Sequence, residues 1–162
     1  MFCRKKAYRA AALCLALFLS AWLLSSQLQA SDEHKDLCQQ INEIGETLRP
    51  YPYVWGGSAP EHGGYDCSGF IYRVHKLMGR PVPRTTARKY YLIAGGDDKH
   101  WEEAVCGDWI WWTFTPNRPF GHIGIHTERP RVWHSGSSTG PTDIFMRQSG
   151  YWDSIFESSK TP

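Results

Sequence analysis

The pattern of apolar residues changes near residue 108, and this change limits the possible folds. Before it, apolar residues recur at helical spacing, which predicts helices over 36–49, 68–78 and 85–94. After it, short runs rich in β-branched and aromatic residues predict strands at 109–114, 122–127, 131–135, 143–147 and 151–156. Helices followed by a series of strands predict an α+β fold, in which N-terminal helices pack on an antiparallel β-sheet.

Cys67 stands where a glycine-rich loop meets the second predicted helix. Asp66 is suited to cap that helix, which would place Cys67 in the first turn. The unpaired N–H groups at a helix start favour a thiolate, and a nearby imidazole would lower the thiol pKa further. We therefore interpret Cys67 as a nucleophile. The alternative, a buried inert thiol or half of a disulfide, is more typical of a cysteine inside an apolar run.

His122 begins a predicted strand whose side chains alternate between two faces. Ile123 and Ile125 form the core face, while His122 and Gly124 share the other. Because glycine has no side chain, another element, such as the Cys67 helix, could approach this second face closely. We expect His122 to be the base that takes the proton of Cys67.

His134 lies on the next predicted strand, and a hairpin through 127–130 would bring it beside His122. A histidine base needs its second nitrogen held by an acceptor, and His134 can provide one. His126 shares the facing of His122 but lies about 13 Å farther along, so we expect it to be partly exposed. Two alternatives stay open: ordinary hydrogen-bonded histidines, or a zinc site from Cys67, His122 and His134, although the close ligand spacing of zinc motifs is absent.

Six segments of the chain resemble, in order and spacing, the successive motifs of the NlpC-type cell-wall peptidases. These segments are Tyr53–Gly57, Asp66–Phe70, Pro83–Ala87, Gly107–Asp108, Gly121–Ile125 and His134–Ser135. Members of that family are papain-like cysteine endopeptidases that cut the stem peptides of bacterial peptidoglycan. The resemblance runs from about Leu48 to Phe156 and implies a papain-like core.

The resemblance also implies catalytic roles. Cys67 matches the nucleophile, His122 the base and His134 the polar residue that orients the base. Tyr53 matches the tyrosine whose hydroxyl lies near the oxyanion site. The implied reaction is hydrolysis through an acyl-enzyme, with neither a metal nor another cofactor.

Three further residues are expected to contact the substrate peptide: Asp66, Ser68 and Arg84. Analogy with the family favours the bond between γ-D-glutamate and the diamino acid of the stem peptide. One alternative is a non-catalytic module that binds the cell wall, although an intact set of cysteine and two histidines argues against it. Another is the same hydrolase used as an antibacterial effector.

The first thirty residues have the features of a secretory signal peptide. Residues 1–6 are basic, 10–24 are almost wholly apolar, and Leu28 and Ala30 occupy the positions that signal peptidase reads. The alternative is a permanent transmembrane anchor, for which the apolar stretch is short. We expect 1–30 to be removed and 31–162 to be one monomeric peptidase domain, exported to the periplasm or cell exterior and associated with the cell wall.

Removal of this leader would change the charge balance. The whole chain has 18 basic and 16 acidic residues, and loss of Arg4, Lys5, Lys6 and Arg9 would leave 14 basic and 16 acidic, a net charge of −2. This balance argues against a basic surface for nucleic acid or anionic lipid. We expect peptidoglycan stem peptides as partners, and neither nucleic acid nor, after cleavage, a membrane.

The leader also holds two of the five cysteines, so Cys38, Cys67 and Cys106 would remain. In an oxidising compartment an odd count suggests one pair and one special thiol. With Cys67 as the nucleophile, Cys38 and Cys106 form the candidate disulfide. Two separate buried thiols are the alternative.

Overall fold

A computed structural model describes residues 2–148 and 150–162, with side chains from residue 19 onward except at 30, 31, 34 and 149. Within these residues, no helix is both long and apolar enough to span a membrane. The predicted leader at 1–30 falls on a helix most of whose leader side chains lie outside the described residues, so its cleavage stays a prediction.

The chain divides into two units, Met1–Asp36 and Leu37–Pro162. Helix α1 (Phe2–Leu48) begins in the first unit and ends in the second. The other helical elements belong to the second unit: η1 (Pro60–His62), α2 (Cys67–Leu77), α3 (Ala87–Ile93), η2 (Trp101–Glu103) and α4 (Tyr151–Ser154). Its strands are β1 (Ser58–Ala59), β2 (Gly64–Tyr65), β3 (Trp109–Trp112), β4 (His122–His126), β5 (Arg131–Gly136), β6 (Gly140–Phe145) and β7 (Phe156–Lys160).

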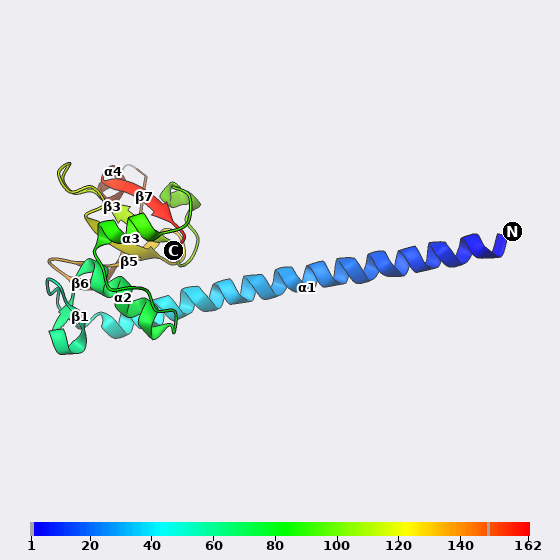
Figure 1. The fold of residues 1–162 in the computed structure, drawn as a ribbon, viewed down its shortest axis with the longest axis horizontal. Coiled ribbons are helices and arrows are strands. Elements are labelled where there is room, and N and C mark those ends of the chain that lie inside the picture. The colour runs from blue at the N-terminus through cyan, green and yellow to red at the C-terminus, as the bar shows by residue number, and fades with distance from the viewer. Residues whose placement is uncertain (1, 149) are drawn as a thin grey trace. The chain divides into compact units, whose positions relative to one another are not determined.

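The strands form two antiparallel sheets (Figure 1). The short strands β1 and β2 pair with each other just before α2. The larger sheet has five strands in the order β6-β5-β4-β3-β7, and every neighbouring pair is antiparallel. Helices therefore precede an antiparallel sheet, and the predicted α+β class is confirmed.

The last predicted strand, 151–156, is wrong. Residues Tyr151–Ser154 form the helical turn α4, and β7 begins only at Phe156. Within the turn, Asp153 accepts a hydrogen bond from the indole N–H of Trp101 at 2.6 Å. A short run of aromatic and apolar residues does not distinguish a strand from a helical turn by periodicity. The local pattern therefore does not specify the helical turn α4, which is accompanied by the contact between Trp101 and Asp153.

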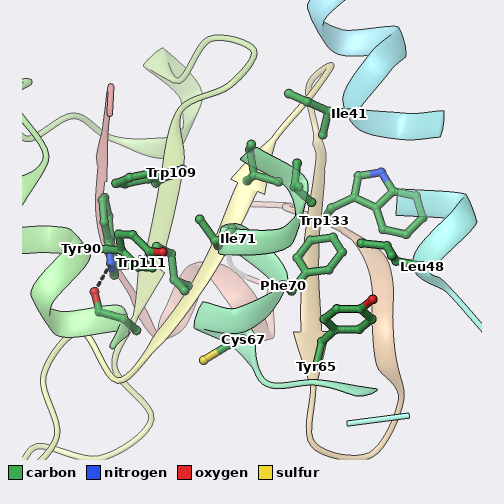
Figure 2. Packing of buried hydrophobic residues seen from close by; sticks show 14 of the residues in the cluster. Ile41, Leu48, Tyr65, Cys67, Phe70, Ile71, Tyr90, Trp109, Trp111 and Trp133 are labelled. Atoms are coloured by element: carbon green, nitrogen blue, oxygen red, sulfur yellow. Dashed lines mark hydrogen bonds between the residues drawn. The ribbon is translucent and has the colours of Figure 1, made fainter. Parts of the chain in front are cut away.

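Buried side chains cover both faces of the five-stranded sheet. The first cluster contains Phe70, Ile71 and Val74 of α2, each fully buried, and the sheet residues Trp109, Trp111, Ile123, Ile125 and Trp133. Complete burial of one such apolar side chain contributes roughly 1.5–3 kcal/mol. Cys67 lies at the edge of this cluster, where α2 begins (Figure 2). The second cluster contains Trp101, Ala104, Ile110, Trp112, Val132 and Met146.

The position of α2 on the sheet differs from the expectation. The helix packs with Ile123 and Ile125, not on the face that His122 and Gly124 share. A Cβ atom at Gly124 would lie 3.0 Å from the ring of Trp112. It would also lie 2.8 Å from the Trp133 carbonyl oxygen and from Val132 of β5, so the glycine makes room for both neighbouring strands and not for the helix.

Cys38 and Cys106 lie close together in the second unit. Their Cα atoms are 5.7 Å apart, and their sulfur atoms are joined as a disulfide across a sequence separation of 68. Cys38 lies in α1, ten residues before its last residue Leu48, and Cys106 precedes β3, so the bond connects this helix to the segment that leads into the sheet. Cys67 is a free, buried thiol.

Candidate active site

Cys67 is the first residue of α2, and the surrounding sequence holds it there. Asp66 caps the helix: its Oδ1 atom accepts hydrogen bonds from the Gly69 N–H at 2.6 Å and the Ser68 hydroxyl at 2.9 Å. A Cβ atom at Gly69 would lie 1.8 Å from the carbonyl oxygen of Gly57, so only glycine admits the preceding loop this close. The predicted cap is confirmed.

The other carboxylate oxygen of Asp66 connects the helix start to Arg84. Its Oδ2 atom accepts hydrogen bonds from Arg84 Nη2 at 3.0 Å and from the Gly56 N–H at 2.9 Å. Arg84 Nη1 also donates to the Ser68 hydroxyl oxygen at 2.8 Å. The three residues expected to contact substrate therefore form one hydrogen-bonded network beside Cys67.

His122 and His134 come from neighbouring strands. His134 in β5 lies opposite Gly124 in β4, so it shares a sheet face with His122 two residues earlier. The two imidazoles are hydrogen-bonded, with 2.8 Å between His122 Nε2 and His134 Nδ1. When His122 Nε2 carries the proton, Nδ1 of the same ring is free to accept one. His126, expected to be partly exposed, is buried with 2% of its surface exposed.

Aromatic rings surround the two histidines. The ring centroids of Trp112 and Phe114 lie 5.6 and 5.3 Å from that of His122, and the Trp152 ring lies 4.9 Å from that of His134. Burial lowers the pKa of His122 well below its ordinary value, and His134 lowers it further. Burial also lowers the pKa of His134 to about 4. Both imidazoles are therefore neutral at neutral pH.

The pKa of the Cys67 thiol is raised, whereas the sequence predicts a lowered pKa. Burial raises its pKa to about 11, and the charge of Asp66 contributes to the rise. Backbone N–H groups, among them that of Ile123, lower the pKa but do not outweigh burial. The contact with Ile123 places the sulfur at the strand residue next to His122. At neutral pH the cleft therefore holds a neutral Cys67 thiol and a neutral His122 imidazole.

All seven predicted site residues line one cleft of about 910 Å³: Tyr53, Asp66, Cys67, Ser68, Arg84, His122 and His134. Burial, followed by the charges of Cys67 and Asp66, raises the pKa of Tyr53 to about 12. Its hydroxyl is therefore protonated at neutral pH and can act as a hydrogen-bond donor in the cleft.

Among the cleft residues that the sequence did not predict, two are aromatic residues beside the histidines. Phe114 and Trp152 both face the histidines and line the cleft. Phe114 lies two residues after the end of β3 and inside the predicted strand 109–114, so the aromatic residues of that strand were the available signal. Trp152 falls in the segment predicted as a strand, so its orientation could not be derived from the sequence. Among the residues that the structure describes, no cluster of histidine, cysteine and acidic side chains is suited to hold a metal ion.

The antiparallel sheet, the helix that begins with a cysteine and the strand-borne histidine pair define a papain-like domain. The model of the NlpC/P60 family matches residues 50–159. The chain therefore belongs to the NlpC/P60 family.

Two relatives illustrate this relationship. The bifunctional muramidase/DL-endopeptidase CwlT of Bacillus subtilis (strain 168) is 33% identical over 103 residues, which is 62% of this chain and 29% of CwlT. The murein DD-endopeptidase MepH of Escherichia coli (strain K12) is 28% identical over 128 residues, which is 75% of this chain and 46% of MepH. This chain thus spans less than half the length of either relative.

A solved structure gives the same result for the fold. It is an NLP/P60 family protein from Staphylococcus aureus subsp. aureus Mu50, described as similar to lipoprotein, with a TM-score of 0.62 and 29% identity. The match covers 78% of this chain and 41% of that one. The expected papain-like architecture is therefore confirmed.

Proposed function

We propose that this chain is a cysteine endopeptidase that hydrolyses the stem peptides of peptidoglycan. The observation that carries the proposal is the joint placement of Cys67 at a helix start and the hydrogen-bonded His122–His134 pair in one cleft. Membership of the NlpC/P60 family and the names of CwlT and MepH support the class of substrate. Export through cleavage after Ala30 and action as a monomer are parts of the same proposal.

The chemistry begins from a neutral thiol. As the Cys67 sulfur attacks the peptide carbonyl carbon, its proton passes to His122 Nδ1, so no stable thiolate is needed beforehand. His122 then gives this proton to the leaving amine, and an acyl-enzyme remains. In the second half, His122 takes a proton from water, whose oxygen attacks the acyl carbon. The C–S bond then breaks, the new carboxyl group leaves, and the Cys67 sulfur takes the proton back from His122. Throughout, His134 accepts a hydrogen bond from His122 Nε2 and keeps the ring oriented.

Negative charge develops on the carbonyl oxygen during each attack. The backbone N–H of Cys67 lies in the first turn of α2, where helix N–H groups lack helical partners. The Tyr53 hydroxyl lines the same cleft and is protonated at neutral pH. We assign these two groups to the oxyanion site.

The network of Asp66, Ser68 and Arg84 is our proposed contact for the stem peptide. It places one acidic and one basic group side by side on the cleft wall, with side-chain exposures of 11% for Asp66 and 29% for Arg84. Among the two relatives, CwlT is named a DL-endopeptidase and MepH a DD-endopeptidase. We propose the D,L bond between γ-D-glutamate and the diamino acid.

Digestion of purified sacculi tests this function. The purified chain should release muropeptide fragments whose peptide ends at γ-D-glutamate, as identified by their masses. The Cys67→Ala variant should release none. Fragments cut at a D,D bond would show that the proposed bond is wrong, while the proposed peptidase activity would stand. Binding to sacculi with no fragments released by the unmodified chain would instead favour the non-catalytic wall-binding alternative. Use as an antibacterial effector would involve the same hydrolysis.

A further inference from the structure

The helical turn α4 brings an indole ring against both histidines of the site. The Trp152 ring meets the His134 ring edge to face, with centroids 4.9 Å apart and planes at 72°. It lies nearly parallel to the His122 ring, with centroids 6.4 Å apart and planes at 25°. Trp152 is partly buried and lines the cleft. It therefore covers the pair from the side of the C-terminal segment.

Contacts outside the cleft fix the place of Trp152. Asp153 accepts the 2.6 Å hydrogen bond from Trp101 Nε1, and the Ile155 carbonyl oxygen accepts one from the Thr113 N–H at 2.9 Å. The ring of Trp112 packs 5.1 Å from that of Trp152. The turn is thus attached to η2 and to the end of β3, and Trp152 has a defined orientation.

The second ring nitrogen of His134, Nε2, lies buried near the Trp152 indole. His134 Nδ1 is used by His122, while Nε2 is buried and has no hydrogen-bond partner among the described residues. When His122 donates to Nδ1, His134 carries its own proton on Nε2. The face of an aromatic ring is electron-rich and accommodates such an N–H edge better than an aliphatic side chain does.

We propose that Trp152 is a positioning residue for the His122–His134 pair, which it orients and shields from water. This inference rests on the proposed function for its catalytic consequence. Trp152 acts through the histidines and not on the peptide bond. Without the indole, water would reach the pair, the imidazoles would become easier to protonate, and the base would lose its fixed orientation.

Several ionisable groups lie near the pair, and a substitution of Trp152 removes none of them. The groups that line the cleft are Cys67, Asp66, Arg84, Tyr53 and Tyr151, and Asp143 in β6 acts on His134 through its charge. A change in histidine titration after substitution of Trp152 would therefore report lost cover and not a lost charge.

The test compares Trp152→Ala with Trp152→Phe and with Met146→Ala. Met146 is buried in the same cluster but does not line the cleft, so its variant controls for a loss of packing. In Trp152→Ala, NMR titration midpoints of His122 and His134 should rise by about one pH unit or more. The kcat for stem-peptide hydrolysis should fall roughly 10- to 100-fold, with little change in KM. Trp152→Phe should keep most of both properties.

Two results would overturn the proposal. One is unchanged midpoints in folded Trp152→Ala, and the other is an equal loss of kcat in Met146→Ala. Should Trp152→Ala fail to fold, Trp152→Leu replaces it: a leucine variant with wild-type midpoints and kcat contradicts a role for the indole ring. The NMR titration needs no substrate. An inactive wild-type chain would therefore refute the proposed function while the titration still decides whether Trp152 shields the pair.

Discussion

Protonation of His75 should destabilise the folded chain as the pH falls. His75 in α2 is buried, with 6% of its surface exposed, and its Nε2 atom accepts a hydrogen bond from Trp109 Nε1 at 2.9 Å. Burial lowers its pKa from 6.5 to about 4. Between these two values the unfolded chain binds the proton more tightly than the folded one. The contribution to stability is therefore complete above about pH 6.5 and is lost as the pH falls through about 4.

The magnitude follows from the two pKa values. One such histidine costs about 2 kcal/mol at pH 5 relative to neutral pH, and about 3 kcal/mol once the pH is below 4. The variant His75→Gln keeps an acceptor for Trp109 but does not titrate. Between about pH 7.5 and pH 5 its free energy of unfolding should fall about 2 kcal/mol less than that of the wild type.

Urea denaturation at several pH values measures this difference. The comparison isolates His75 because the acidic groups and His134 titrate equally in both proteins. His75 does not line the cleft that contains Cys67, so activity near neutral pH serves as a check on the fold. An identical loss of stability in wild type and His75→Gln would refute the assignment of a neutral, buried His75.

Two further predictions concern the histidine pair and the cysteine bridge. His122→Ala should lower the rate of stem-peptide hydrolysis by roughly 100-fold or more. His134→Ala should lower it by a smaller factor, because the base remains. Equal losses in a kinetic assay would give His134 a direct role as base. Loss of the Cys38–Cys106 bond in Cys106→Ser should lower the free energy of unfolding by about 4 kcal/mol by the chain-entropy relation for its separation of 68 residues. Intact mass under non-reducing conditions, after alkylation of Cys67, should show no further free thiol in 31–162, and two more would contradict the bridge.

Local sequence signals account for the elements that hold Cys67, the proposed nucleophile. The apolar stripe Phe70, Ile71 and Val74 and the cap Asp66 predict the helix and the place of Cys67 in its first turn, and both are present. Strand alternation and a short hairpin likewise bring His134 to the face of His122. These signals depend on neighbours in the chain, so a single sequence is enough to reveal them.

Properties that depend on tertiary packing could not be predicted from local sequence signals. The alternation in β4 defines two faces but does not say which one α2 covers. Trp152 lies on a helical turn held by Trp101 and Asp153, a hydrogen bond across 52 residues. The thiol pKa of Cys67 rises because folding buries it, whereas its position at a helix start favours the opposite shift.

In the proposed mechanism, the Cys67 sulfur forms a covalent acyl-enzyme with the stem peptide. The most direct measurement is acid quenching of the wild-type chain during turnover of a defined stem peptide, followed by mass analysis of the fragment that contains Cys67. We expect an added mass equal to the acyl part of the cleaved peptide on this cysteine, and no such mass in Cys67→Ala. Hydrolysis that persists in Cys67→Ala, with no adduct in the wild type, would contradict the proposed mechanism.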